Sequence, residues 1–269
     1  MLFDGTSFEL IKSYPLGDVI LSRAKWHPTK KKLAVITQSD SFKAKILDLN
    51  LDQWIELEGL KNSLRALDWN YDGSLLAVSE FEGEISIFDS SGKSISRFIA
   101  DPKSVTGLDW HPSKNILTAV GSRIGIYDQI GNPIKVFTPR DKEVLLLCVE
   151  WHHSGKYFAT GDYGYAENAE DKCLQYWNVE GEKISEHGIS HAEYRNIRWS
   201  PDGKTLASAN DALRLWDQNG QLMSESKSSE DYLWGIDWNS DGSMIVTSSD
   251  KGVINLWDKK LNLRKTLTY

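Results

Sequence analysis

Cysteine is scarce in this sequence, and long apolar runs are absent from it. Cys148 and Cys173 are too few for a disulfide framework and lack the spacing of metal ligands, so we expect two free, partly buried thiols, with a bridge as the alternative. This cysteine usage favours a reducing, cytoplasmic compartment. The longest apolar stretch is much shorter than a membrane span, and no basic stretch followed by an apolar segment opens the chain. We expect a soluble protein that does not bind membranes.

Clustered positive charge is also missing. The net charge is −7, and the lysines are dispersed among carboxylates. Nucleic-acid affinity depends mainly on concentrated Lys and Arg, so we do not expect DNA or RNA as a ligand. The chain has 269 residues, of which 40% are hydrophobic. That is enough for one or two domains with a buried core.

One sequence motif occurs six times along the chain. It consists of a short alternating apolar stretch, a tryptophan and a polar turn. The tryptophans are Trp26, Trp69, Trp110, Trp151, Trp199 and Trp238, at spacings of 43, 41, 41, 48 and 39 residues. This period is that of a four-stranded propeller blade, about 40–45 residues. Within each period apolar residues alternate at period two between Gly, Asp and Pro turns, and no stretch predicts a helix.

Two motifs carry a family resemblance. Trp-Ser-Pro-Asp-Gly at 199–203, followed by Leu-Trp-Asp at 215–217, resembles a WD40 repeat, and the copy at 238–258 does so too. The resemblance implies an all-β, WD40-type β-propeller, in which four-stranded antiparallel blades form a closed ring around a channel. We predict one domain, residues 1–269, with six blades, and seven as the alternative. The Gly-His pair that usually precedes the innermost strand in this family is absent from every copy.

The two ends of the chain compete for one place in the ring. Leu2-Phe3-Asp4 and residues 8–12 look like the end of a third strand and an outer strand, whereas residues 261–267 could supply the outer strand of the last blade. The sequence leaves this choice open. The start within a motif also leaves open that the chain is one domain of a larger scaffold protein.

Nine of the eleven tryptophans fit the repeat and are predicted to be core residues. Six end the innermost strands, and the other three are Trp177, Trp216 and Trp257. Large aromatic side chains of this kind supply much of the packing between blades.

The sequence predicts no enzyme, no cofactor and no metal site. His27, His111 and His152 occupy the same turn of different repeats, so we interpret them as turn residues and not as metal ligands. The stretch 160–165 is rich in Gly but lacks the Lys and Ser/Thr of a phosphate loop. Four carboxylates stand directly before a repeat tryptophan and follow the repeat pattern, not an acid and base pair: Asp68, Asp109, Glu150 and Asp237.

The resemblance implies that partners bind the face where the innermost strands start. Residues four and six positions before each tryptophan are predicted to share that end of the strand. Those at four are Ser22, Arg65, Thr106, Leu147, Arg195 and Trp234, and those at six are Ile20, Ser63, Ser104, Leu145, Glu193 and Tyr232. Arg, Tyr and Trp are enriched at binding hot spots, so we predict a site for a protein or peptide with acidic and apolar side chains. The candidate residues are Arg65, Glu193, Arg195, Tyr232 and Trp234, with a solvated charge at the channel as the alternative for the two arginines.

An insertion at residues 162–171 accounts for the longest repeat spacing and should project onto the same face. Its Tyr163 and Tyr165 join the candidate site, although a tolerated surface elaboration is the alternative. The sequence as a whole predicts a non-enzymatic scaffold for protein or peptide binding. A propeller that binds a small molecule or metal at the channel mouth is the other hypothesis, and the oligomeric state is not predicted.

Overall fold

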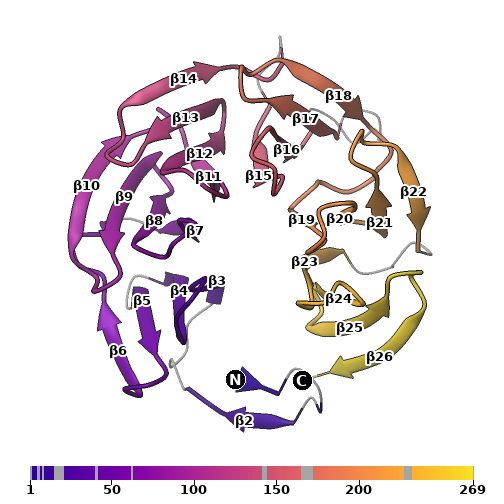
Figure 1. The fold of residues 1–269 in the computed structure, drawn as a ribbon, viewed down its shortest axis with the longest axis horizontal. Coiled ribbons are helices and arrows are strands. Elements are labelled where there is room, and N and C mark those ends of the chain that lie inside the picture. The colour runs from indigo at the N-terminus through magenta and orange to yellow at the C-terminus, as the bar shows by residue number, and fades with distance from the viewer. Residues whose placement is uncertain are drawn as a thin grey trace.

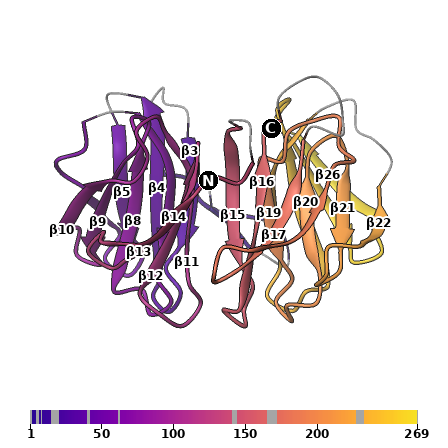
Figure 2. The same ribbon diagram turned by 90° about the horizontal axis from the view of Figure 1, so that it is seen from above.

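The computed structural model describes residues 2–4, 7, 9–14, 21–39, 42–61, 63–140, 144–164, 172–226 and 232–268, without the side chains of 38, 39, 42 and 43. Every regular element in these ranges is a β-strand. Six four-stranded antiparallel sheets stand as blades around a channel (Figure 1). In the view of Figure 2 the strands run roughly along the channel axis. The predicted six-bladed propeller is confirmed.

In each blade the strands follow one another from the channel outwards. Blade 1 contains β3 (Leu21–Trp26), β4 (Lys32–Ser39), β5 (Phe42–Asp48) and β6 (Gln53–Glu56). Blade 2 contains β7 (Leu64–Trp69), β8 (Leu75–Glu80), β9 (Glu84–Asp89) and β10 (Ser94–Ile99). Blade 3 contains β11 (Val105–Trp110), β12 (Ile116–Gly121), β13 (Ile124–Asp128) and β14 (Pro133–Phe137).

The second half of the chain repeats this arrangement. Blade 4 contains β15 (Leu146–Trp151), β16 (Tyr157–Asp162), β17 (Leu174–Asn178) and β18 (Lys183–His187). Blade 5 contains β19 (Asn196–Trp199), β20 (Leu206–Ala209), β21 (Leu213–Trp216) and β22 (Leu222–Glu225). Blade 6 contains β23 (Leu233–Trp238), β24 (Met244–Ser249), β25 (Val253–Asp258) and β26 (Leu263–Thr268).

The acid that ends most third strands builds the turn to the outer strand. Asp89 Oδ1 accepts hydrogen bonds from the amides of Ser91 at 2.8 Å and Lys93 at 3.1 Å. Asp128, Asp217 and Asp258 accept the equivalent amides in their own blades. A short carboxylate that binds the backbone two residues on stabilises a tight turn. This explains why a Trp-Asp or Phe-Asp pair recurs at the end of the third strand.

The core lies in the seams between neighbouring blades. One face of each blade places small or branched residues, such as Ala66 and Ala77 of blade 2, against the next blade. The facing side of that next blade contributes larger residues, such as Val105, Trp110 and Tyr127 of blade 3. Similar clusters fill the other seams from blade 1 to blade 6. Tight packing of this kind joins the blades into a single domain.

The turn histidines are seam residues. The ring of His152 lies 4.7 Å from that of Trp199 in the next blade, centroid to centroid. Its Nδ1 accepts the Ser154 amide at 3.1 Å, so Nε2 carries the proton and donates to the Gly203 carbonyl at 2.8 Å. A Cβ at Gly203 would lie 2.9 Å from His152 Nε2, and the residue has φ +68°. Glycine is therefore required at this turn by both its conformation and its neighbour.

The two ends of the chain belong to different sheets. β26 is the outer strand of blade 6, whereas β1 (Leu2–Phe3) and β2 (Leu10–Lys12) pair with each other in a separate two-stranded sheet. This sheet lies in the interval between blade 6 and blade 1 (Figure 1). The prediction that Trp26 is a core residue is wrong, because no complete blade covers it and 49% of its surface is exposed.

Candidate functional site at the channel mouth

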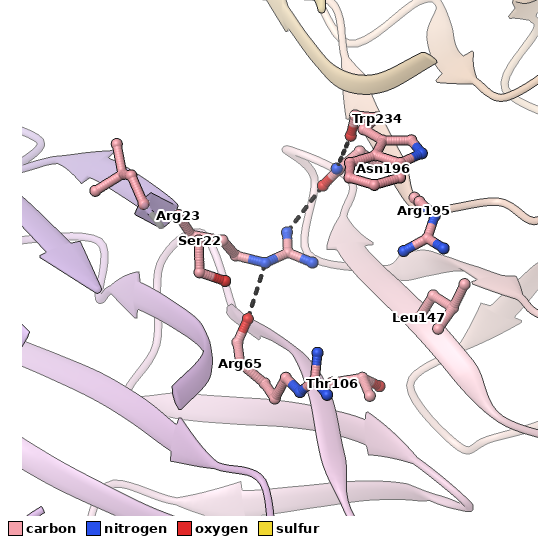
Figure 3. Close-up of a pocket in the computed structure, with 9 residues that line it drawn as sticks. Ser22, Arg23, Arg65, Thr106, Leu147, Arg195, Asn196 and Trp234 are labelled. Atoms are coloured by element: carbon pink, nitrogen blue, oxygen red, sulfur yellow. Dashed lines mark hydrogen bonds between the residues drawn. The ribbon is translucent and has the colours of Figure 1, made fainter. Parts of the chain in front are cut away.

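A pocket of about 250 Å³ opens where the innermost strands begin. It is lined by all six residues that stand four positions before the repeat tryptophans, together with three others from strands β3 and β19: Ser22, Arg65, Thr106, Leu147, Arg195, Trp234, Leu21, Arg23 and Asn196. Figure 3 shows these side chains around the hollow. Residues about 40 positions apart in the sequence thus meet at one site.

A β-bulge aims these side chains at the channel. In blade 2 the register between β7 and β8 shifts around Arg65, and equivalent shifts occur around Ser22, Thr106, Leu147 and Trp234. An extra residue in a strand interrupts the alternation of faces and redirects a side chain. Because the bulge lies at position four, the side chains at positions four and six do not follow one unbroken alternation. Among the described residues, none at position six lines the pocket.

Arg23 is the residue that sequence reasoning missed. Its Nε donates to the Arg65 carbonyl at 3.0 Å, and its Nη1 donates to Asn196 Oδ1 at 2.8 Å, so that it spans the channel (Figure 3). Burial lowers the pKa of Arg23, and the charges of Arg198, Arg195 and Arg65 lower it further. The sequence did contain a signal for this residue. Most blades have Ala, Gly or Cys three residues before the repeat tryptophan, whereas blade 1 has an arginine at that position.

Two arginines of the pocket stack on exposed aromatic rings. The Arg195 guanidinium lies 4.8 Å from the centre of the Trp234 ring, and that of Arg65 lies 4.5 Å from the Phe81 ring. Within the described residues, the buried Nε atoms of Arg65 and Arg195 have no hydrogen-bond partner. Stacking holds each guanidinium in place.

The remaining candidates surround this pocket without lining it. Glu193 forms an ion pair with Arg195, and Tyr232 is exposed. Tyr163, also exposed, donates its amide to the Leu145 carbonyl at 2.9 Å, which places the start of the 162–171 insertion at the same end of blade 4 as the pocket. Tyr165 and the rest of that insertion lie outside the described residues.

The residues directly before the repeat tryptophans form a second, mostly acidic layer in the channel. Lys25 Nζ lies 3.1 Å from Asp68 Oδ1, and Arg198 pairs with Glu150. Burial raises the pKa of Asp109 well above its usual value, and the charges of Asp68 and Glu150 raise it further. The backbone N–H of the next blade's Trp151 donates to Asp109 Oδ2. These carboxylates therefore join blades, and the channel carries positive charge at one mouth and mainly acids beyond it.

The described part of the chain contains no group of three or more His, Cys, Asp or Glu residues placed to hold a metal ion. Cys148 and Cys173 are both buried, and neither forms a disulfide. Burial raises the pKa of each thiol to about 12, so neither forms a reactive thiolate near neutral pH. Among the described residues no helix is long and apolar enough to cross a bilayer.

Comparison with known proteins finds two family matches. Residues 24–113 match the Anaphase-promoting complex subunit 4 WD40 domain. Residues 131–178, 183–217 and 220–258 match the WD domain, G-beta repeat. Together these ranges include all six repeat tryptophans and span most of the ring.

Distant relatives align with more than half of this chain. The Intraflagellar transport protein 80 homolog of Mus musculus is 24% identical over 195 residues, which cover 68% of this chain and 23% of that protein. Protein HIR1 of Cryptococcus neoformans var. neoformans serotype D is 24% identical over 175 residues, which cover 55% of this chain and 19% of that protein. The chain thus spans less than a quarter of the length of either relative. On its repeats, its fold and these matches, the chain belongs to the WD40-repeat family.

Proposed function

We propose that this propeller is a non-enzymatic interaction scaffold that binds an acidic and apolar segment of a partner protein at the channel mouth. The observation that carries the proposal is the convergence of Arg23, Arg65 and Arg195 with the half-exposed Trp234 in one pocket. Acidic side chains of the partner would enter among the guanidinium groups. An apolar side chain would pack on Trp234 and the adjacent, exposed Tyr232.

The electrostatics of the pocket favour an anionic group. Arg23 faces the positive charges of Arg65, Arg195 and Arg198, and the guanidinium groups of Arg65 and Arg195 are oriented by their aromatic neighbours. A carboxylate that accepts two N–H groups of one guanidinium forms a strong, geometrically specific pair. Such a pair would also relieve the repulsion among the arginines.

The chemistry of the lining supports binding over catalysis. Its polar members are arginines, Ser22, Thr106 and Asn196, and its described residues include no His, Cys, Asp or Glu. General acid or base catalysis needs a group that titrates near neutral pH, and nucleophilic catalysis needs a base beside the nucleophile. Hydroxyls beside permanently charged guanidinium groups do not meet either requirement.

The relatives agree with a scaffold role at the level of the family. A WD40 propeller that forms part of larger chains, as in the two relatives, presents a rigid surface to other proteins. We place the protein in the cytoplasm, because two buried cysteines without a disulfide suit a reducing compartment. We treat the six blades as one functional domain.

The test is a selection of random peptides displayed on phage, followed by affinity measurements on synthetic copies of the selected peptides. We expect sequences that combine Asp or Glu with an aromatic or aliphatic residue. The Arg195→Ala/Trp234→Ala variant should weaken their binding about 100-fold, since hot-spot truncations each cost about 1–2 kcal/mol or more. Binding should also weaken as salt rises.

A matched control carries the same kinds of change at the other end of the strands. Lys204→Ala/Tyr71→Ala removes an exposed charge and an exposed aromatic from the turns that follow the innermost strands. This variant should bind as the wild type does, and thermal melting should show that both variants fold. Selected peptides that bind the Arg195/Trp234 variant unchanged, or that lack acidic residues, would refute the proposed site.

A further inference from the structure

Two arginines at the channel mouth each stack on an exposed aromatic ring. The Arg65 guanidinium lies 4.5 Å from the centre of the Phe81 ring, and the Arg195 guanidinium lies 4.8 Å from that of Trp234. Phe81 is 45% exposed and Trp234 is 46% exposed. Each pair therefore places a positive charge beside an apolar face. We call the two pairs the Arg65–Phe81 clamp and the Arg195–Trp234 clamp.

Phe81 extends the site beyond the residues that line the pocket. It directly follows β8, and its amide donates to the carbonyl of Ser63, just before β7, at 2.7 Å. This bond holds Phe81 at the mouth end of blade 2. The clamps differ in one respect: Arg195 forms an ion pair with Glu193, whereas Arg65 forms none among the described residues. The Arg65–Phe81 clamp thus offers a second contact for an acidic and an apolar side chain, without a competing acid of its own.

The clamps lie on opposite sides of the channel. Arg65 is in β7, whereas Arg195 directly precedes β19 and Trp234 is in β23. Figure 1 shows β7 across the channel from β19 and β23, and Figure 3 shows the side chains of Arg65 and Arg195 on either side of the pocket. A ligand that contacts both clamps must therefore span the mouth.

A series of hydrogen bonds connects the two clamps. Arg23 Nε donates to the Arg65 carbonyl at 3.0 Å, and Arg23 Nη1 donates to Asn196 Oδ1 at 2.8 Å. The side-chain amide of Asn196 donates in turn to the Trp234 carbonyl. These bonds join the backbones of blades 2 and 6 across a ring with tightly packed seams, so the clamps are held at a fixed separation. The positive charge of Arg23 lies between them.

The size of the pocket favours a peptide over a small molecule as the ligand of both clamps. The pocket measures about 250 Å³, whereas pockets that enclose drug-sized ligands measure roughly 300–1,000 Å³. Trp234 lines the pocket, but Phe81 does not. A ligand enclosed by the pocket therefore does not cover the Phe81 ring. An extended peptide can place side chains in the pocket and on both rings while its backbone crosses the rim.

We propose that the partner segment crosses the mouth as an extended chain and carries two acidic–apolar pairs of side chains, one for each clamp, separated by a short spacer. This inference rests on the proposed function. In each pair the carboxylate accepts N–H groups of the guanidinium, and the apolar side chain packs on the aromatic ring. The spacer passes over Arg23 and is therefore neutral or acidic, not basic.

The fixed separation of the clamps makes the affinity depend on the length of the spacer. Once one pair is bound, the other is held near its clamp at an effective concentration in the millimolar range. A spacer that is too short prevents the second contact, and one that is too long dilutes it. A segment with the matching spacer should therefore bind at least about tenfold more tightly than one pair alone.

The experiment uses synthetic peptides of defined sequence. Two-pair peptides have the form acetyl-Asp-Leu-linker-Leu-Asp-amide, with linkers of two, four, six or eight alternating Gly and Ser residues. The one-pair peptide is acetyl-Asp-Leu-Gly-Ser-amide. Calorimetry at low salt should show two one-pair peptides bound per protein but only one two-pair peptide. We expect the affinity of the two-pair peptides to pass through a maximum as the linker lengthens.

Spectra and variants locate the two contacts. In ¹H–¹⁵N spectra the best two-pair peptide should shift the Nε–H signals of both Arg65 and Arg195, assigned with Arg65→Gln and Arg195→Gln. Arg65→Gln/Phe81→Leu and Arg195→Gln/Trp234→Leu remove one clamp each while keeping apolar bulk. Each should lower the affinity of this peptide at least about tenfold and abolish its dependence on linker length. Thermal melting should show that both variants fold.

Two controls separate the clamps from general electrostatic attraction. Lys204→Ala/Tyr71→Ala, at the other end of the strands, should leave the affinity and the optimal linker unchanged. A Lys in the middle of the best linker should weaken binding and an Asp should strengthen it, because the linker passes over Arg23.

Three results would overturn the proposal. One is an affinity that does not depend on linker length. Another is unchanged binding of the best peptide in Arg65→Gln/Phe81→Leu. Either result would mean that the Arg195–Trp234 clamp acts alone, which the proposed function allows. The third is the failure of every peptide in the series to bind, and the selection from random peptides then tests the proposed function separately.

Discussion

Replacement of two equivalent tryptophans should destabilise the protein unequally. Trp26 and Trp110 end the innermost strands of blades 1 and 3, but 49% of Trp26 and only 4% of Trp110 is exposed. A tryptophan has about 200 Å² of surface to bury, and each Å² contributes about 25 cal/mol, so the difference in burial corresponds to about 2 kcal/mol.

A hydrogen bond adds to the difference. The Trp110 indole donates to the Asp68 carbonyl at 3.1 Å inside the seam, and its removal leaves that carbonyl without this partner at a cost of about 1 kcal/mol. Trp110→Ala should therefore lower the free energy of unfolding by about 4–5 kcal/mol, within the range for large core truncations. Trp26→Ala should lower it by about 2 kcal/mol.

The assay is equilibrium unfolding in urea at 25 °C, followed by far-UV circular dichroism so that the loss of a fluorophore does not disturb the signal. If Trp110→Ala does not fold, the milder pair Trp26→Leu and Trp110→Leu gives the same comparison. Equal losses of stability at the two positions would refute the reasoning, because they would mean that Trp26 is as buried in solution as Trp110.

Two further predictions concern the seams. Burial lowers the pKa of His111 and His152, so the unfolded chain binds more protons than the folded one once the pH falls below about 6.5, and stability should fall with it. The double variant His111→Asn/His152→Asn uses a side chain that other repeats carry at this turn. Its urea midpoint should change less between pH 7.5 and 5.5 than that of the wild type. An unchanged pH dependence would contradict the assignment of this effect to the two histidines. Gly155→Ala adds a Cβ 2.4 Å from His111 Cε1 at φ +65° and should cost about 2–3 kcal/mol in urea unfolding. Gly252→Ala, at φ +76° with no atom within 4 Å, should cost about 1 kcal/mol, and equal costs would show that the clash is unimportant.

The candidate site was partly readable from the sequence. A six-fold repeat places equivalent residues at equivalent positions, so the residues four before each tryptophan could be grouped before any coordinates were known, and they do line one pocket. The residues at position six could not be placed, because a bulge breaks the alternation on which the inference relied. Arg23 was missed because its role depends on Asn196, 173 residues away.

The turn histidines were likewise predicted only in part from the sequence. Their shared turn position identified them as turn residues, and not as expected metal ligands. Their contact with the glycine turn of the next blade could not be inferred, because it depends on the angle between blades.

The sequence by itself determined the six repeats, the strand order within a blade and the residues four positions before each tryptophan that meet at the channel mouth. Period-two alternation sets which side of a strand is buried, and a repeat of fixed length converts that local rule into a ring. Only the tertiary structure decided how the ring ends. Whether β2 or β26 completes blade 6, and whether Trp26 is covered, depends on contacts between residues at opposite ends of the chain, which no local pattern encodes.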